Sequence, residues 1–194
     1  MKSKQLILYV AIFGLGALAM WFVPYVFNGV HGHHDYAEQM AAHHGSGEHS
    51  HDEVNMPGLQ GKDTTEDEVI DLKAIFRNHA QITRSVENLS NGIRTITETK
   101  NDELRDAIVS HVVGMIARLE EKRDPKIIIQ SPTLDKLFDG SEAIKTVVTM
   151  TETGVAVTQT SSDPSIVEAL QTHADEVSDM ARRGMQAVHE RMMK

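Results

Sequence analysis

The stretches ITRSVENLSNGIRTITET (82–99) and IKTVVTMTETGVAVTQT (144–160) decide the fold, because they are two versions of one pattern. When the chain is shifted by 62 residues (from 92 to 154) without a gap, Gly92 falls on Gly154 and His111 falls on His173. Further matches are Ile82 with Ile144, Val86 with Val148 and Ala107 with Ala169. A match of this kind predicts one supersecondary unit that is used twice.

Each stretch reads as a hairpin followed by a helix. Both are rich in β-branched residues, and each contains a turn signal, Ser90-Asn91-Gly92 in the first and residues 152–154 in the second. Helices should follow, from residue 101 or 102 to about 123 and from 162 or 163 to about 192, with Gly184 as a possible break. We therefore expect an α+β fold in which two ββα repeats (about 80–123 and 142–193) form a four-stranded antiparallel sheet with helices on one face.

Two further segments complete the expected soluble part, residues 63–194. A shorter amphipathic helix should begin near Asp63 or Thr64 and run to about Asn78, because acidic residues follow its capping position and apolar residues recur along it. Residues 126–140 separate the two repeats. We expect them to bridge the repeats and to cover one end of the core.

Residues 6–27 are apolar or small and carry no charge, which predicts a transmembrane helix of about 33 Å. Lys2 and Lys4 precede this run, and the next Lys or Arg is Lys62, so residues 1–5 should be cytoplasmic. The chain would then span the cytoplasmic (inner) membrane once, with its C-terminal domain in the periplasm or outside the cell. The alternative is a cleaved signal peptide ending near residues 17–19, but the apolar run continues beyond that point.

The expected linker, residues 28–62, is rich in histidine. Imidazoles interleaved with carboxylates suit zinc or copper, so this composition indicates metal binding. The alternatives are a polar linker that binds metals only weakly and a tether that responds to pH near 6. The candidate metal ligands are His31, His33, His34, His43, His44, His49 and His51.

Composition excludes several classes of function. The formal net charge is -9, which argues against nucleic acid as a partner because phosphate binding needs a basic surface. The chain contains no cysteine, which removes thiolate catalysis, covalent c-type haem and iron–sulfur clusters. No sequence motif of a known catalytic class is present, so we expect a protein that is not an enzyme.

The two equivalent histidines are the candidate cofactor ligands. His111 follows Leu104 and Ile108 on one helical stripe, and His173 follows Ile166 and Leu170 on the other, so both should point inward. One interpretation is that each is a core histidine that bonds to the main chain. If the pair binds a cofactor, the options are a non-covalent haem held by two imidazoles, or copper held with the Met115 thioether, with His79 as a further candidate.

These patterns support two hypotheses about function. The first is a membrane-anchored extracytoplasmic metal- or haem-binding protein for metal delivery or electron transfer, attached to a membrane redox complex. The second is a non-catalytic accessory subunit of a membrane complex, in which the histidines are structural and the linker binds metal incidentally. In both, the partners are the bilayer, through residues 6–27, and other membrane subunits. The stripe of Met185, His189 and Met193 is expected to pack rather than to ligate.

Overall fold

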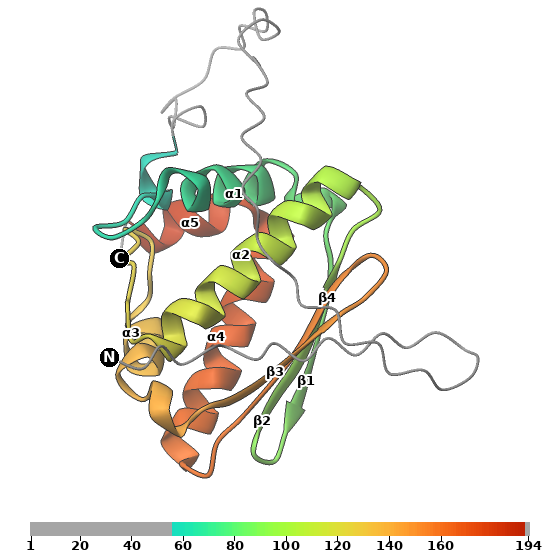
Figure 1. Cartoon of the computed structure of the whole chain (residues 1–194). Coiled ribbons are helices and arrows are strands. Elements are labelled where there is room, and N and C mark those ends of the chain that lie inside the picture. Colours follow the sequence, from blue (N-terminus) through green and yellow to red (C-terminus); the bar gives the residue numbers. More distant parts are fainter. Residues whose placement is uncertain (1–55, 193–194) are drawn as a thin grey trace, which may run out of the picture. The chain divides into compact units, whose positions relative to one another are not determined.

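A computed structural model describes residues 56–192 of the chain (Figure 1). The predicted transmembrane helix, residues 6–27, and all seven histidines of the linker lie outside the described residues. Among residues 56–192, no helix combines the length and the apolar character needed to cross a bilayer.

The first half of the described chain holds four helical elements and a hairpin. Thr65 caps the first long helix through a capping box with Glu68, and Asn101 caps the second by accepting a bond from the Leu104 amide. The elements are the 3₁₀ turn η1 (Pro57–Leu59), α1 (Glu66–Arg77), η2 (His79–Gln81), β1 (Thr83–Leu89), β2 (Gly92–Glu98) and α2 (Asp102–Glu120).

The second half repeats the order from α1 onwards, without a counterpart of η1, and adds one helix. Asp163 caps the long helix and Pro164 occupies its first turn, where the missing amide hydrogen costs nothing. Gly184, with φ 57°, ends that helix. The segment predicted to be helical up to about residue 192 is therefore divided into two helices at this glycine. The elements are α3 (Pro132–Asp139), η3 (Ser141–Ala143), β3 (Lys145–Met150), β4 (Gly154–Thr160), α4 (Pro164–Arg183) and α5 (Met185–Met192).

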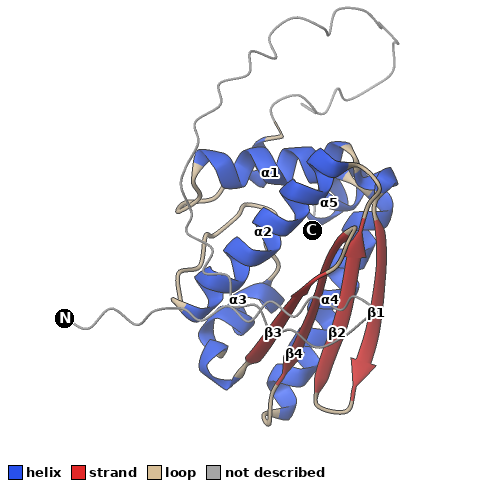
Figure 2. Ribbon diagram, turned by 45° about the vertical axis from the view of Figure 1, so that its right-hand side comes forward, coloured by secondary structure: helices blue, strands red, loops and turns tan. Residues whose placement is uncertain are grey.

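The four strands form one antiparallel sheet in the order β1-β2-β4-β3, and both views show the helices on one side of it (Figures 1 and 2). The α+β class and the four-stranded antiparallel sheet predicted from the sequence are confirmed. β2 and β4 lie at the centre, where Thr95 pairs with Val157, its own equivalent under the shift of 62 residues. A pseudo-twofold axis therefore passes through the middle of the sheet.

The structural repeat is longer than the ββα unit. α1 and α3 are also equivalent, and their sequences LKAIF (72–76) and LDKLF (134–138) match at the same shift. The 3₁₀ turns that follow carry equivalent bonds, from the Ile82 amide to the His79 carbonyl and from the Ile144 amide to the Ser141 carbonyl. The segment predicted to bridge the two repeats thus contains the first helix of the second one.

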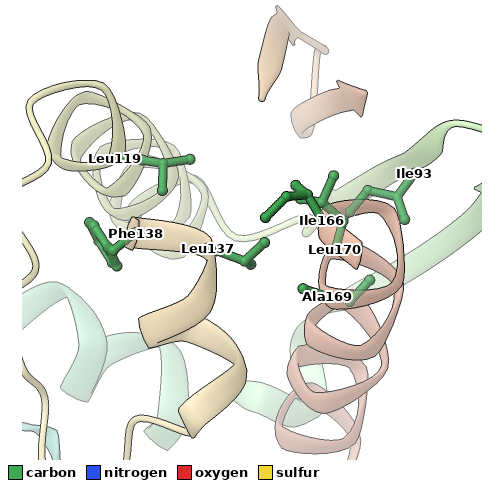
Figure 3. Close-up of a cluster of buried hydrophobic side chains, with 8 residues drawn as sticks. Ile93, Leu119, Leu137, Phe138, Ile166, Ala169 and Leu170 are labelled. Carbon is green, nitrogen blue, oxygen red and sulfur yellow. The ribbon is translucent and has the colours of Figure 1, made fainter. Parts of the chain in front are cut away.

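Each long helix covers strands of the other repeat. α2 packs on β4, whereas α4 packs on β1 and β2, and the short helices α1 and α3 pack on α2 and α4 respectively. Figure 3 shows one result, a buried cluster in which α3 and α4 meet residues of α2 and β2. Its labelled members are Ile93, Leu119, Leu137, Phe138, Ile166, Ala169 and Leu170.

Candidate functional site: a histidine-lined cavity

A cavity of about 270 Å³ lies between the sheet and the helices. The inner faces of β2 and β4 form its floor, and α2 and α4 form its walls. Residues of α1, η2, β1 and α3 and of the segment 127–131 also line it. The lining is mostly aliphatic and aromatic. The cavity lies on the pseudo-twofold axis, because equivalent residues line it in pairs: Thr95 with Val157, Ile93 with Val155, Phe76 with Phe138, and His111 with His173.

His111 enters the cavity from α2. Burial lowers the pKa of the His111 imidazole to about 4, with the Glu68 carboxylate opposing this shift and His173 adding to it. The imidazole is therefore neutral near pH 7. A neutral imidazole is the form that binds a metal ion, because its lone pair is not blocked by a proton.

His173 enters the same cavity from α4. Its Nδ1 atom is buried and has no hydrogen-bond partner among the described residues. The nearest carboxylate oxygen, Oε2 of Glu176, lies 3.7 Å away, and this oxygen already accepts a 2.7 Å bond from the Ser131 hydroxyl. A buried polar atom without a partner costs about 1–3 kcal/mol, so this atom indicates a ligand or water site.

The other two predicted site residues also line the cavity, but their surroundings differ. Nδ1 of His79 lies 3.1 Å from the Ala181 carbonyl, to which it donates, and the imidazole ring packs against Gly184. His79 therefore ties η2 to the end of α4. Met115 packs against the cluster of Figure 3 and presents its thioether on the same helix as His111.

The stripe of Met185, His189 and Met193, which was expected to pack rather than to ligate, can be followed only in part in the described residues. On α5 the fully buried side chains are Ala187 and Val188, while Met185 is only partly buried against its neighbours. Met193 lies outside the described residues. Within residues 56–192, no group of three or more His, Asp or Glu side chains is arranged to hold a metal ion.

Arg84 is a cavity residue that the sequence reasoning missed. It lies on β1, where Nη1 donates to the Thr97 hydroxyl at 2.7 Å and Nε donates to the Ser178 hydroxyl at 3.3 Å. The signal was available in the sequence: Ile82, just before β1, and Val86 within it share a face with Arg84, which places a charged residue on the inward face. A charge at an inward position is a stronger indication of a site than an inward histidine.

No family model, curated protein or solved structure matches this chain. The case for a function therefore rests on the cavity and its residues, together with the sequence patterns outside the described region.

Proposed function

We propose that this chain is a membrane-anchored, extracytoplasmic cofactor-binding protein, in which the cavity between α2 and α4 holds a haem or a copper ion through His111 and His173. The observation that carries the proposal is that two equivalent imidazoles line one apolar cavity, one of them with an unpartnered buried nitrogen. Such a protein would serve metal delivery or electron transfer beside a membrane redox complex.

Haem is favoured over copper in this cavity. A haem brings four ligand atoms of its own, so two imidazoles complete its iron. Copper would need a third protein ligand, for which Met115 is the candidate, and the described residues hold no group of three His, Asp or Glu. The largely apolar lining also suits an organic group. The cavity's volume of about 270 Å³ lies near the lower end of the range of small-molecule pockets. To admit a haem, α2 and α4 would therefore have to move apart.

The rest of the proposal comes from residues outside the described part of the chain. Residues 6–27 anchor the protein in the bilayer, and the absence of Lys and Arg between Lys4 and Lys62 places the domain on the outer side. The seven linker histidines would collect copper or zinc near the membrane surface.

The test uses the full chain in a lipid nanodisc, with the seven linker histidines replaced by asparagine so that they cannot bind added metal. Haemin is titrated in and the visible spectrum is recorded. We expect one equivalent to bind with the absorption of a six-coordinate, low-spin iron held by two imidazoles. His111→Ala and His173→Ala should each abolish that spectrum, because one imidazole leaves a coordination position open.

His189→Ala is the matched control, because this histidine lies on α5 and does not line the cavity. It should leave the spectrum unchanged. A copper titration of the same samples distinguishes the two cofactors: one tightly held equivalent that depends on Met115 would favour copper. If both cavity variants keep the wild-type spectrum and the wild-type copper content, the paired-imidazole site is wrong.

The accessory-subunit hypothesis is supported by a different observation. No described helix covers the outer face of the sheet, and Val147 on β3 is 60% exposed there (Figure 2). An uncovered sheet face with an exposed valine is a surface on which another subunit could pack. Extraction in a mild detergent followed by native sizing tests this: Val147→Lys should release the chain from a larger complex, whereas a monomeric wild type would exclude the hypothesis.

A further inference from the structure

Arg84 holds a positive charge that the described part of the protein does not neutralise. Its two hydrogen-bond partners, Thr97 and Ser178, are neutral hydroxyls. None of the ion pairs among residues 56–192 involves Arg84, whereas Arg118, Arg123, Arg105 and Arg183 all pair with carboxylates. Arg84 is half-buried beside an apolar cavity, where the attraction to an anion is less weakened by water than at an exposed site.

The Arg84 guanidinium keeps its charge although burial lowers its pKa. Burial lowers the pKa of Arg84 to about 10, so the guanidinium remains protonated near pH 7. Its Nε and Nη1 atoms are occupied by the two hydroxyls, and Nη2 forms no hydrogen bond within the described residues. The Nη2 atom of the guanidinium can therefore donate a hydrogen bond to an acceptor that enters the cavity.

The second repeat shows that the fold does not require a cation here. The equivalents of Arg84 and Thr97 are Thr146 on β3 and Gln159 on β4, and the Gln159 amide donates to the Thr146 hydroxyl at 3.3 Å. The same cross-strand pair is thus satisfied with neutral side chains. Arg84 makes one end of the cavity cationic. The packing of the repeats does not require this charge.

Glu176, the carboxylate that lines the same cavity, is engaged elsewhere. It accepts bonds from the hydroxyls of Ser131 and Thr133, on the side of α4 that faces α3. Arg84 bonds to α4 through Ser178, on the side that faces β1. The cavity therefore offers apolar walls and a half-buried cationic donor that no carboxylate among the described residues neutralises.

We propose that the occupant of this cavity is an apolar molecule that carries a carboxylate, and that this carboxylate pairs with Arg84. The inference uses the same cavity as the proposed function and names the class of molecule that fits it. A carboxylate can take two parallel hydrogen bonds from a guanidinium, which fixes the orientation of the bound molecule as well as adding affinity. Both haem, through its propionates, and a medium-chain fatty acid belong to this class.

The test compares octanoate with 1-octanol, which share the apolar chain and differ in the charged group. Binding to the full chain in nanodiscs is measured by isothermal titration calorimetry, with empty nanodiscs subtracted. We expect saturable octanoate binding to the wild type. Arg84→Thr, which introduces the residue of the second repeat, should weaken octanoate binding by about 10- to 100-fold and leave 1-octanol binding unchanged.

Two further variants separate the charge from the fold. Arg94→Thr is the matched control, because Arg94 lies on the opposite, exposed face of the sheet and should not affect octanoate binding. Arg84→Lys keeps the charge without the fork and should retain part of the affinity. A thermal melt of each variant confirms that it is folded.

The outcomes also distinguish this proposal from the proposed function. If Arg84→Thr binds octanoate as tightly as the wild type, or if the wild type shows no saturable binding, the carboxylate assignment is overturned. His111→Ala should lose the haem spectrum yet keep octanoate binding. Octanoate binding that depends on Arg84, in a protein that takes up no haem, would support the carboxylate site and refute the haem.

Discussion

The two repeats share a backbone frame but differ in how their parts are held together. In both, a glycine begins the inner strand: Gly92 pairs with Thr160, and Gly154 pairs with Glu98. The side-chain contacts that stabilise this backbone frame differ between the two repeats. Arg118 of α2 binds Glu68 and Asp63, whereas its equivalent on α4, Met180, packs in an apolar cluster with α1 and α5. Backbone geometry is thus common to the two repeats, while polar side chains distinguish them.

This difference separates structural from functional residues. A feature that occurs in both repeats, such as the two glycines, is explained by the shared frame. A polar residue that occurs in one repeat is explained by its local partners, as Arg118 is, or it lacks such an explanation, as Arg84 does. His111 and His173 are the unusual case, because a polar residue recurs in both repeats and both copies reach one cavity.

The largest expected effect is at the paired glycines. A Cβ atom at Gly92 would lie 1.9 Å from the Gln159 carbonyl oxygen, and one at Gly154 would lie 2.0 Å from the Thr97 carbonyl oxygen. In both cases the obstacle is backbone of the neighbouring central strand, which cannot rotate away. Gly92→Ala and Gly154→Ala should each destabilise the fold by about 3 kcal/mol or more, measured by urea denaturation.

The equal size of the two glycine effects is the sharper part of this prediction. If the central pairing is symmetric, the two variants should lose similar stability and the double variant should not fold. A loss at one glycine and full tolerance at the other would show that the repeats do not share the frame described for β2 and β4.

Arg118 is the next largest expected effect. Its side chain is 1% exposed and donates to Glu68 at 2.5 and 2.7 Å and to the Asp63 carboxylate at 3.0 Å. It lies near the surface and is covered by these partners, which can be hydrated once it is gone. Arg118→Met, the residue of the second repeat, should therefore cost about 2–4 kcal/mol, somewhat below the loss typical of a deeply buried pair.

The Arg118 effect should depend on pH. The Arg118 guanidinium lowers the pKa of the Glu68 carboxyl from its ordinary 4.5 to about 2. A lowered carboxyl pKa stabilises the fold above the ordinary value, and this stability is lost as pH falls towards 2. The gap in unfolding free energy between wild type and Arg118→Met should therefore be constant above about pH 5 and narrow below it. A gap that stays constant down to pH 3 would contradict this origin.

The repeat and the sheet could be predicted from the sequence because they depend on local patterns. Asn91-Gly92 marks a turn, and the β-branched residues on either side of both turns mark strands, so the four-stranded sheet followed. The short helix α3 was missed because eight residues give a weak period, although LKAIF and LDKLF match at the shift already in use.

The candidate site could be predicted only in part. The inward phase of His111 and His173 followed from helical spacing, and both line the cavity. The bond of His79 to the Ala181 carbonyl and the bond of Arg84 to the Ser178 hydroxyl could not be foreseen, because each joins residues about one hundred positions apart. Such contacts depend on how the repeats pack, which a local pattern does not encode.

His111 should make stability fall in mild acid. Its pKa is lowered to about 4 by burial, against an ordinary value of 6.5, so the unfolded chain binds the proton more readily than the folded one. Stability is therefore complete above about pH 6.5 and is lost as pH falls towards 4, by up to about 3 kcal/mol. The difference in unfolding free energy between wild type and His111→Gln should change by this amount between pH 7 and pH 4, as followed by urea titrations. An unchanging difference would show that the imidazole is not buried.

Gly114 offers the smallest effect and the opposite sign. It lies inside α2 at the position equivalent to Glu176 of α4, and a Cβ there would meet nothing within 4 Å. Glycine inside a helix is less favourable than alanine, because the flexible backbone loses more entropy on folding. Gly114→Ala should raise the unfolding free energy by about 0.5–1 kcal/mol in urea titrations and leave octanoate binding unchanged. Because Gly114 and the two strand glycines carry the same substitution, a stabilisation here beside a loss at Gly92 and Gly154 would show that backbone contact, and not glycine itself, makes the central positions intolerant. A destabilised Gly114→Ala would mean that α2 is packed more tightly at this point than the structure has it.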